Sequence, residues 1–202
     1  MKIYNSPVAP NPRRVRVFLA EKGIQVPYED IDIANAVNRQ PEFRKKNPLA
    51  GVPVLELDDG ACIAESVAIC RYFEELQPEP PLFGAGAEGK AMVEMWNRRM
   101  ELALFLPIAD AFRQRHDFFK GRIRQAPEYA EVQKQNAEDA LKWLDTELAN
   151  RRYIAGDRFS IADITAMVGI DFGRVSKIAI QPDQKNLARW HQEVSSRPSA
   201  KA

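Results

Sequence analysis

Residues 47–66 read Asn-Pro-Leu-Ala-Gly-Val-Pro-Val-Leu-Glu-Leu-Asp-Asp-Gly-Ala-Cys-Ile-Ala-Glu-Ser, and this stretch decides how the first part of the chain folds. Residues 52–57 carry apolar and β-branched side chains, an Asp-Asp-Gly turn follows, and residues 61–64 read as a short return strand. The pattern predicts an antiparallel hairpin. Because Pro53 has no N–H for a ladder, it belongs on an edge or at a tight bend, where a cis peptide bond fits.

The two ends of this hairpin predict a site for a small peptide acid. At the entry, the backbone N–H and C=O of Val52 stay outside the ladder and can pair with an extended peptide. At the exit, Glu65-Ser66 precedes a helical pattern over residues 67–76. Unpaired amides at that helix start, beside the Ser66 hydroxyl, attract a carboxylate. The alternative is that Pro53 is only a structural edge proline and Ser66 a plain helix cap.

Composition excludes several classes of function. The 202 residues contain 29 Lys and Arg against 28 Asp and Glu, so no net field favours nucleic acid or an anionic membrane. The N-terminus enters a strand pattern with no secretory apolar region, and the longest apolar run is too short to cross a bilayer. Cys62 and Cys70 lie in apolar patterns that suit reduced thiols in a cytoplasm. His116 and His191 lack partners at ligand spacing, so we expect no metal.

The first half of the chain alternates strand and helix. Strands are expected at 2–4 and 26–33, a helix at 12–23 and a short irregular helix at 41–46. Asn11 is a preferred N-cap residue, Pro12 suits the first helical position, and Gly23 fits the C-terminal cap. The arginines at 13, 14 and 16 are expected on the solvated face of this helix, from which one can steer an anionic ligand.

The second half of the chain predicts helices only. After a Pro- and Gly-rich linker at 78–89, helices are expected at 90–118, with a kink at Pro107, then at 128–148, from Ser160 onward, and at 186–194. Ser160 and Asp163 have the spacing of a capping box, with Phe159 and Ile164 as its hydrophobic staple. We therefore expect an α/β domain at 1–80 followed by an all-α domain at 89–202.

Over nearly its whole length the chain resembles the cytosolic glutathione S-transferases. The resemblance rests on the segment 47–55, on Glu65-Ser66, on Gly-Asp-Arg-Phe-Ser-Ile-Ala-Asp-Ile at 156–164, on Trp190 and on Arg-Pro-Ser at 197–199. The Val-Pro, Glu-Ser and Ser-Ile-Ala-Asp elements are specific together, in this order and spacing. The resemblance implies a thioredoxin-like N-terminal domain, an all-helical second domain of the glutathione-transferase type, glutathione as co-substrate and a homodimer.

The resemblance also assigns roles to residues of the hairpin. It implies that Val52 pairs through its backbone with the cysteinyl part of glutathione and that Pro53 is cis. It further implies that Glu65 and Ser66 hold the γ-glutamyl end. These roles agree with the peptide edge and the carboxylate site inferred above.

Transferase chemistry requires the glutathione thiol as a thiolate. A thiol with a pKa near 8.5 must lose roughly 2 pKa units, about 2.7 kcal/mol, to be mostly ionised at pH 7. Members of the family supply a Tyr, Ser or Cys from the loop after the first strand. Here alignment from the helix places Asn11 or its neighbours at that position, and Pro10-Asn11 resembles the Asn-bearing bacterial Nu-class and related fungal proteins. Asn11 is the predicted donor to sulfur and Ser6 the second candidate, although Asn11 can be an N-cap and Ser6 a turn residue.

The second substrate is expected between this loop and the long helix after the linker. Met100, Phe105, Phe112 and His116 have spacings that place them either on that wall or in the core, and the pattern does not separate the two. The family's substrate class implies hydrophobic electrophiles or organic hydroperoxides.

Two other functions stay open. A thiol-disulfide reductase would use its own cysteine, but residues 1–51 contain none. A non-catalytic module would keep the glutathione pocket without turnover.

Overall fold

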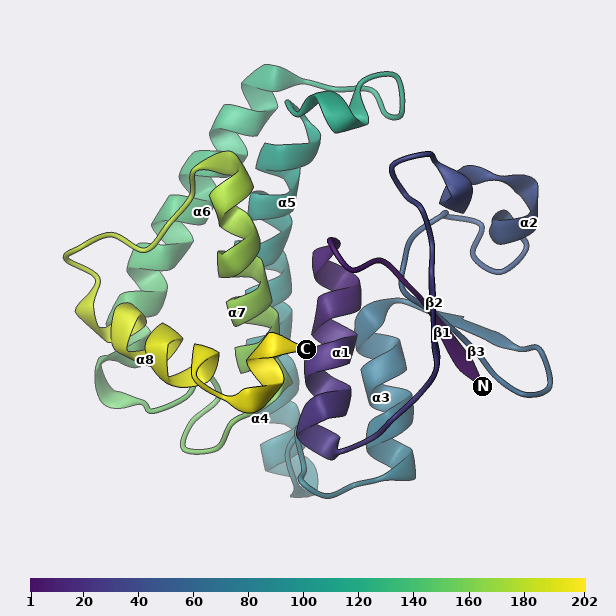
Figure 1. Ribbon diagram of the computed structural model, residues 1–202. Coiled ribbons are helices and arrows are strands. Elements are labelled where there is room, and N and C mark those ends of the chain that lie inside the picture. The colour runs from purple at the N-terminus through teal and green to yellow at the C-terminus, as the bar shows by residue number, and fades with distance from the viewer. The chain divides into compact units, whose positions relative to one another are not determined.

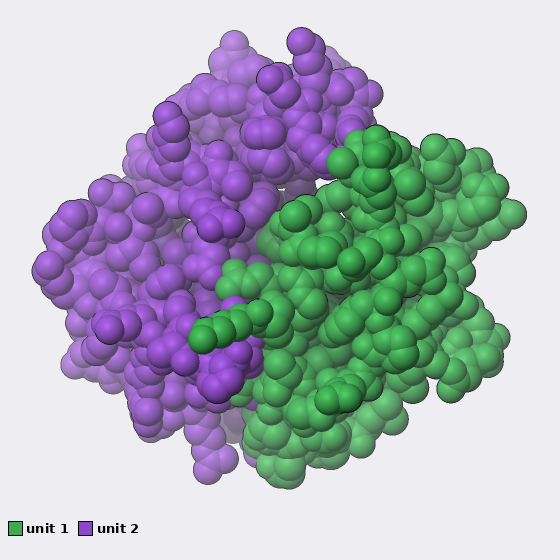
Figure 2. Space-filling view, in the orientation of Figure 1, with its two compact units in different colours: residues 1–81, 201–202 green, residues 82–200 purple.

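The computed structural model describes all residues from 1 to 202 and divides into two compact units. Unit 1 comprises Met1–Pro81 and Lys201–Ala202, and unit 2 comprises Leu82–Ala200. Figure 2 draws unit 1 in green and unit 2 in purple. The sequence pattern placed domains at 1–80 and 89–202.

Unit 1 is a four-stranded mixed sheet with helices (Figure 1). Its elements are β1 (Lys2–Asn5), α1 (Pro10–Lys22), β2 (Tyr28–Asp30), α2 (Pro41–Arg44), β3 (Val54–Glu56), β4 (Cys62–Ala64) and α3 (Ser66–Leu76), with a 3₁₀ turn at Val37–Arg39. The strand order is β2-β1-β3-β4: β1 is parallel to β2 and antiparallel to β3, which pairs antiparallel with β4. The predicted hairpin is confirmed, and Gly60 takes φ 85° in its turn.

The two faces of the sheet bury different partners. Tyr4 and Val54 are paired across β1 and β3, and with Phe43 of α2 they form a small core on one face. Ile3 and Leu55, one residue along each strand, point to the other face, since side chains alternate along a strand. The helices α1 and α3 pack against each other beside the sheet (Figure 1).

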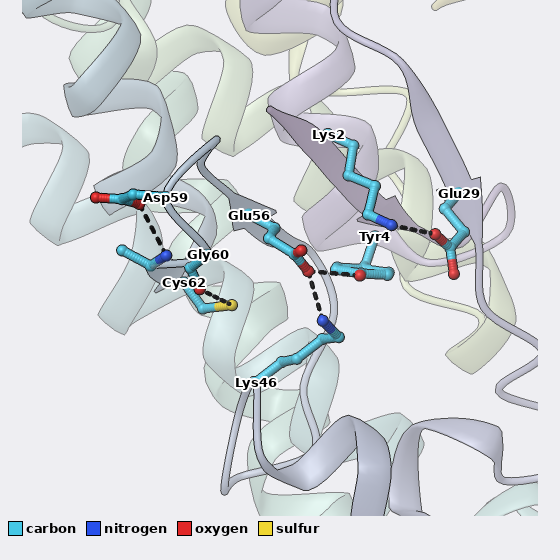
Figure 3. A network of polar contacts seen from close by, with 9 residues as sticks. Lys2, Tyr4, Glu29, Lys46, Glu56, Asp59, Gly60 and Cys62 are labelled. Carbon is cyan, nitrogen blue, oxygen red and sulfur yellow. Dashed lines mark hydrogen bonds and ion pairs between the residues drawn. The ribbon is translucent and has the colours of Figure 1, made fainter.

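A polar network fastens the chain after α2 to the sheet (Figure 3). The Tyr4 hydroxyl donates to the Glu56 carboxylate at 2.6 Å, and the Lys46 ammonium pairs with the same carboxylate while lying over the Tyr4 ring. The hydrogen bond from Lys46 lowers the pKa of Glu56. Lys2 and Glu29 add a second ion pair across β1 and β2. These contacts fix the start of the segment that leads to Val52.

The first helix begins two residues earlier than the sequence predicted. Its N-cap is Ala9 in extended conformation, so Pro10 takes the first helical position and Asn11 lies inside the first turn. The prediction of Asn11 as N-cap is therefore wrong, because Pro10 fits the first position as well as Pro12 does. The C-terminal prediction is confirmed, since Gly23 caps the helix at φ 67°. The strand expected at 26–33 is also shorter, with only Tyr28–Asp30 in the ladder.

Lys22 holds the end of unit 1 in place. Its ammonium is completely buried, pairs with Glu74 of α3 and donates to the carbonyls of Gln77, Pro78 and Pro80 at 2.8, 3.1 and 2.6 Å. One buried cation thus satisfies orphan carbonyls at and beyond the α3 C-terminus, where cations are favoured.

Unit 2 is entirely helical, as predicted. Its helices are α4 (Gly86–Arg99), α5 (Leu106–Arg113), α6 (Pro127–Glu147), α7 (Ile161–Gly173) and α8 (Lys185–Ser195), with 3₁₀ turns at Asp117–Phe119, Leu148–Asn150, Arg174–Ser176 and Pro198–Lys201. Every residue of α7 from Ile161 to Ile170 is buried, and α4, α5 and α8 pack against it. None of the helices has the length and apolar character needed to cross a membrane.

The kink expected at Pro107 takes the form of a π-helical segment. Residues Met100–Phe105 join α4 to α5, and the Leu106 N–H donates to the Glu101 carbonyl five residues back. Pro107 has no N–H to donate to residue 103, so the ladder widens in front of it. The helix expected to reach residue 118 ends at Arg113.

A buried carboxylate organises the start of α7. Ser160 and Asp163 form the predicted capping box, and Asp163 also accepts hydrogen bonds from the Ile154 N–H at 2.9 Å and from Trp190 Nε1 at 2.8 Å. It therefore joins a loop, α7 and α8. Complete burial raises the pKa of Asp163 to about 6, despite the hydrogen bonds that lower it.

We expect Asp163→Asn to destabilise unit 2 by about 3 kcal/mol, because an amide group would face the Ser160 donors. Because of this raised pKa, the free energy of unfolding also depends on pH. The folded state binds the proton before the unfolded state does, so this contribution is present at low pH and is lost as the pH rises through 6. The free energy of unfolding of the wild type relative to the variant should fall by about 1 kcal/mol from pH 5 to pH 7.

Denaturant titrations followed by tryptophan fluorescence test this, because Trp96, Trp143 and Trp190 all lie in unit 2. If the difference in free energy of unfolding between wild type and variant stays constant over this pH range, Asp163 does not take up a proton as we expect.

Candidate functional site

The entry to the β3–β4 hairpin is not at the edge of the sheet, because β3 lies between β1 and β4, but the chain just before β3 is outside the ladder. The Val52–Pro53 bond is cis, which confirms the sequence prediction, and β3 begins only at Val54. The main chain of Val52 therefore lies outside the ladder. The preceding loop is held by side chains, since Asn47 Nδ2 donates to the Gly51 carbonyl at 3.0 Å and Asn38 Nδ2 donates to the Ala50 carbonyl at 2.7 Å.

The exit from the hairpin has strained backbone. Glu65 is the N-cap of α3 and has φ 69° and ψ 118°, an uncommon conformation for a residue with a side chain. Its side chain makes no cap, and Ser66 is the first residue of the helix rather than its cap. The plain-cap alternative for Ser66 is therefore wrong. The α3 N-terminus keeps unpaired N–H groups next to the Ser66 hydroxyl.

A buried arginine stands behind Ser66. Arg14 of α1 is 2% exposed, and its Nη1 donates to Ser66 Oγ at 2.8 Å. The sequence pattern had placed this arginine on a solvated face, and that prediction is wrong. The signal was present, because Arg14 lies four residues before Phe18 and eight before Lys22, on one buried stripe of α1.

The α1 N-terminus offers few backbone donors. The first N–H groups of a helix have no intrahelical partner, but Pro10 and Pro12 have no N–H at all. The Arg13 N–H donates to the Ala9 carbonyl at 3.3 Å. Asn11 is therefore the first-turn residue whose N–H points out of the helix end, and its half-buried side chain carries a second amide. Ser6, the other predicted donor, is 1% exposed.

Arg16 holds the loop between β1 and α1. Its Nη1 donates to Asn5 Oδ1 at 2.8 Å and its Nη2 donates to the Pro7 carbonyl at 3.2 Å. Asn5 in turn donates to Asp30 at 2.6 Å. Partial burial lowers the pKa of the Arg16 guanidinium from its ordinary value. Sequence reasoning missed this role, since the helical spacing of Arg16 gives no sign of a loop that folds back over it.

The residues predicted to line an electrophile site are dispersed within unit 2. Met100 is completely buried, so the core alternative holds for it, and Phe105 is 8% exposed. Phe112 is half-buried and stacks at a tilt with the exposed His116, with 4.5 Å between ring centroids. Both belong to a small pocket of about 90 Å³ between α5, α6 and the 3₁₀ turn at Arg174–Ser176.

Two family models match the chain, one in each unit. The family described as "Glutathione S-transferase, N-terminal domain" matches residues 8–76, and the "Glutathione S-transferase, C-terminal domain" matches residues 95–198. The chain is 37% identical to Glutathione S-transferase 2 of Saccharomyces cerevisiae, over 100% of this chain and 88% of the relative.

Two crystal structures show the same fold. A glutathione S-transferase domain-containing protein of Marinobacter aquaeolei VT8 is 38% identical and has a TM-score of 0.94, covering 98% of this chain and 99% of that one. Gtt2 of Saccharomyces cerevisiae is 36% identical with a TM-score of 0.95, covering 100% of this chain and 99% of that one. A thioredoxin-like unit followed by an all-helical unit defines a glutathione-transferase fold. The chain belongs to the glutathione S-transferase family.

We expect Arg16→Lys to loosen the β1–α1 loop, because a lysine ammonium cannot reproduce the two-nitrogen contact with Asn5 and Pro7. The free energy of unfolding should fall by about 1 kcal/mol. Hydrogen–deuterium exchange should speed up in a peptide covering residues 4–12 and stay unchanged in one covering the β3–β4 hairpin. Equal exchange in wild type and variant would show that Arg16 does not hold the loop.

Proposed function

We propose that unit 1 binds glutathione and activates its thiol as a thiolate for attack on a hydrophobic electrophile or an organic hydroperoxide. The observation that carries this proposal is that the main chain of Val52, just outside the ladder, and the open helix start at Ser66 lie at the two ends of one hairpin. Membership of the glutathione S-transferase family supports it.

In the proposed complex, the main chain of Val52 pairs with the cysteinyl residue by strand addition. The cis peptide bond before Pro53 turns the chain between Val52 and β3, and Pro53 has no N–H to donate to the ladder. The N–H groups of α3 and the Ser66 hydroxyl bind the γ-glutamyl carboxylate, while the exposed carboxylate of Glu65 faces its ammonium group.

We propose Asn11 as the group that stabilises the sulfur anion. Its side-chain amide and its backbone N–H supply two donors, and the α1 dipole adds a positive potential at the same end. A depression of the thiol pKa by roughly 2 units requires about 2.7 kcal/mol, which two such hydrogen bonds can provide. Ser6 is the weaker candidate because it lies outside α1, four residues before Pro10, and so does not belong to the helix start.

The electrophile belongs, in this proposal, to unit 2, where Phe112 and His116 are the predicted residues that reach the surface. Met100 is completely buried, so it packs in the core of unit 2 instead. The two cysteines, half-buried Cys62 and buried Cys70, suit the reducing cytoplasm that we propose as the location. Neither lies in the β1–α1 loop, so the reductase alternative gains no support.

Replacement of Asn11 tests thiol activation. The thiolate absorbance of bound glutathione, titrated against pH, should give a pKa well below that of free glutathione in the wild type. Asn11→Ala should raise this pKa by about 1 unit and lower kcat about 10-fold, because it removes only the side-chain donor. Asn11→Asp should raise it further, since a carboxylate repels the sulfur anion.

Ser66→Ala is the matched control for binding. It should raise the KM for glutathione and leave kcat nearly unchanged, whereas Asn11→Ala should do the reverse. A bound thiol that titrates like free glutathione in the wild type would overturn the catalytic proposal. The chain would then be a binding module without turnover.

We also propose that the protein is a homodimer through an apolar groove of unit 2. The groove has a volume of about 540 Å³ and is lined by residues of the π-helical segment, α5 and α6, namely Leu102, Ala103, Leu106, Pro107, Gln133, Asn136, Asp139, Ala140 and Trp143. Leu102 and Leu106 are 53% and 42% exposed, and contact of such large apolar side chains with water is unfavourable. The family resemblance supports a second copy as the occupant.

We expect the double variant Leu102→Glu and Leu106→Glu to sediment as a monomer at concentrations where the wild type sediments as a dimer. Two buried carboxylates without partners would disfavour association. Val175→Glu, which changes an exposed apolar residue outside the groove, should leave the wild-type mass. A dimeric double variant would place the interface elsewhere.

A further inference from the structure

The side chain of His116 has a hydrogen-bond polarity that its own turn fixes. His116 is the N-cap of the 3₁₀ turn at Asp117–Phe119, and its Nδ1 accepts a hydrogen bond from the Phe118 N–H at 3.1 Å. An imidazole nitrogen that accepts carries no hydrogen, so the ring is neutral and its hydrogen is on Nε2. The ring is exposed and lines the pocket of about 90 Å³ in unit 2. Nε2 therefore offers a donor, and a ligand group that meets it must be an acceptor.

An aromatic cluster lies beside this donor. Its centre is Phe112, whose ring meets Phe119 and Phe172 edge to face, with 5.5 and 5.2 Å between ring centroids. The His116 ring lies at a tilt to the same ring at 4.5 Å. None of these four side chains is buried. Partly exposed rings next to a pocket favour a ligand that is itself a planar ring, because ring pairs gain more than their buried area alone provides.

The charges around the pocket are mainly positive. Residues 113–124 contain five Arg and Lys against one Asp, whereas the other 190 residues contain 24 against 27, since the whole chain has 29 and 28. Arg115 and Lys134 line the pocket, and its one acidic lining residue, Glu131, is paired with Arg115. Lys134 approaches Glu138 at 3.8 Å. The local field therefore favours an anionic acceptor at the pocket over a neutral one.

The third wall of the pocket adds to this field. It consists of Val175 and Ser176, which lie between the exposed Arg174 and Lys177 in the chain. The volume of about 90 Å³ is well below the roughly 300 Å³ from which pockets for whole drug-sized ligands begin. The pocket therefore suits one small anionic group of a ligand, with the rest of the ligand outside it.

We propose that His116 selects aromatic second substrates that carry a carboxylate. The carboxylate accepts the Nε2 hydrogen in the positive pocket, and the ring that bears it lies against Phe112. This inference rests on the proposed function, because it takes the reaction to be attack of the glutathione thiolate on that ring. On a chloronitro-substituted ring, sulfur forms a bond to the carbon that bears chlorine, and the carbon–chlorine bond breaks to release chloride. The thiol proton goes to solvent, so no further reactant is needed.

Two ring substrates of nearly the same shape test this selection. 4-Chloro-3-nitrobenzoate carries the carboxylate, and 4-chloro-3-nitrobenzamide carries a neutral amide at the same position. The kcat/KM for each, at saturating glutathione, is divided by the rate constant of the uncatalysed reaction, which removes the difference in ring reactivity. The wild type should then prefer the benzoate by about 10-fold, as expected for one charge-assisted hydrogen bond. Equal corrected values would overturn the inference.

Three variants assign the preference to the donor. His116→Phe keeps a ring against Phe112 and removes the donor, so the preference should fall to within about 2-fold. His116→Gln keeps an amide donor and should retain about a 5-fold preference. Lys90→Gln removes an exposed charge from the first half of α4, outside the pocket, and should keep the full preference. A wild-type preference in His116→Phe would show that His116 does not select the carboxylate.

Binding without turnover separates this inference from the proposed function. 3-Nitrobenzoate and 3-nitrobenzamide lack the chloride leaving group, and calorimetry should show about 10-fold tighter binding of the benzoate. The ¹⁵N signal of His116 Nε2 should shift with the benzoate and not with the benzamide. If this binding preference is present but neither chloronitro substrate is conjugated, the proposed function has failed and the carboxylate site stands. If both substrates are conjugated and neither measurement shows a preference, the carboxylate site is overturned and the proposed function stands.

Discussion

The hydrogen bond from Arg14 to Ser66 ties together the two helices of unit 1 whose N-terminal ends the proposed site uses. It joins the second turn of α1 to the first residue of α3, at a point where both side chains are buried. The contact sets the relative position of the two helix starts, and these starts carry the backbone N–H groups that the proposed site uses. A neutral side chain at position 14 would pack in this space, but it would leave the hydroxyl of Ser66 free to turn either way.

Long cationic side chains hold the loops of unit 1. Its strands contain only three or four residues, so the sheet supplies few ladder bonds to fix the connecting segments. Arg16 donates to the loop after β1, Lys22 to the carbonyls after α3, and Lys46 pairs with Glu56. Arg16 and Lys22 satisfy backbone carbonyls that the short elements leave unpaired, whereas Lys46 binds a side-chain carboxylate on β3.

Local signals in the sequence predicted those parts of the fold that depend on neighbouring residues. The hairpin follows from alternation around Asp-Asp-Gly, the start of α7 from the spacing of Ser160 and Asp163, and the end of α1 from Gly23. Each is determined within a few residues.

Features that depend on contacts between residues far apart in the sequence were harder to predict. The burial of Arg14 requires α3 beside it, and the full burial of Met100 requires the surrounding helices of unit 2. Pro10 and Pro12 fit the first helical position equally well, so the start of α1 was ambiguous. The π-helical segment is a response of the ladder to Pro107, and composition predicts a disturbance there without its form.

The proposed binding mode places three different demands on one small ligand, and together these demands define its direction. The unpaired main chain at Val52 accepts any extended backbone, so it gives affinity with little selectivity. In this mode the α3 end favours a carboxylate, because the first N–H groups of the helix and the Ser66 hydroxyl can donate to it. The α1 end favours an anion that forms only on deprotonation, because a thiol gains less from these donors than a thiolate does. A peptide that carries a carboxylate at its end and a thiol on its middle residue satisfies all three demands. In this mode the charged and polar groups of the ligand, rather than apolar contacts, decide which peptide the site accepts.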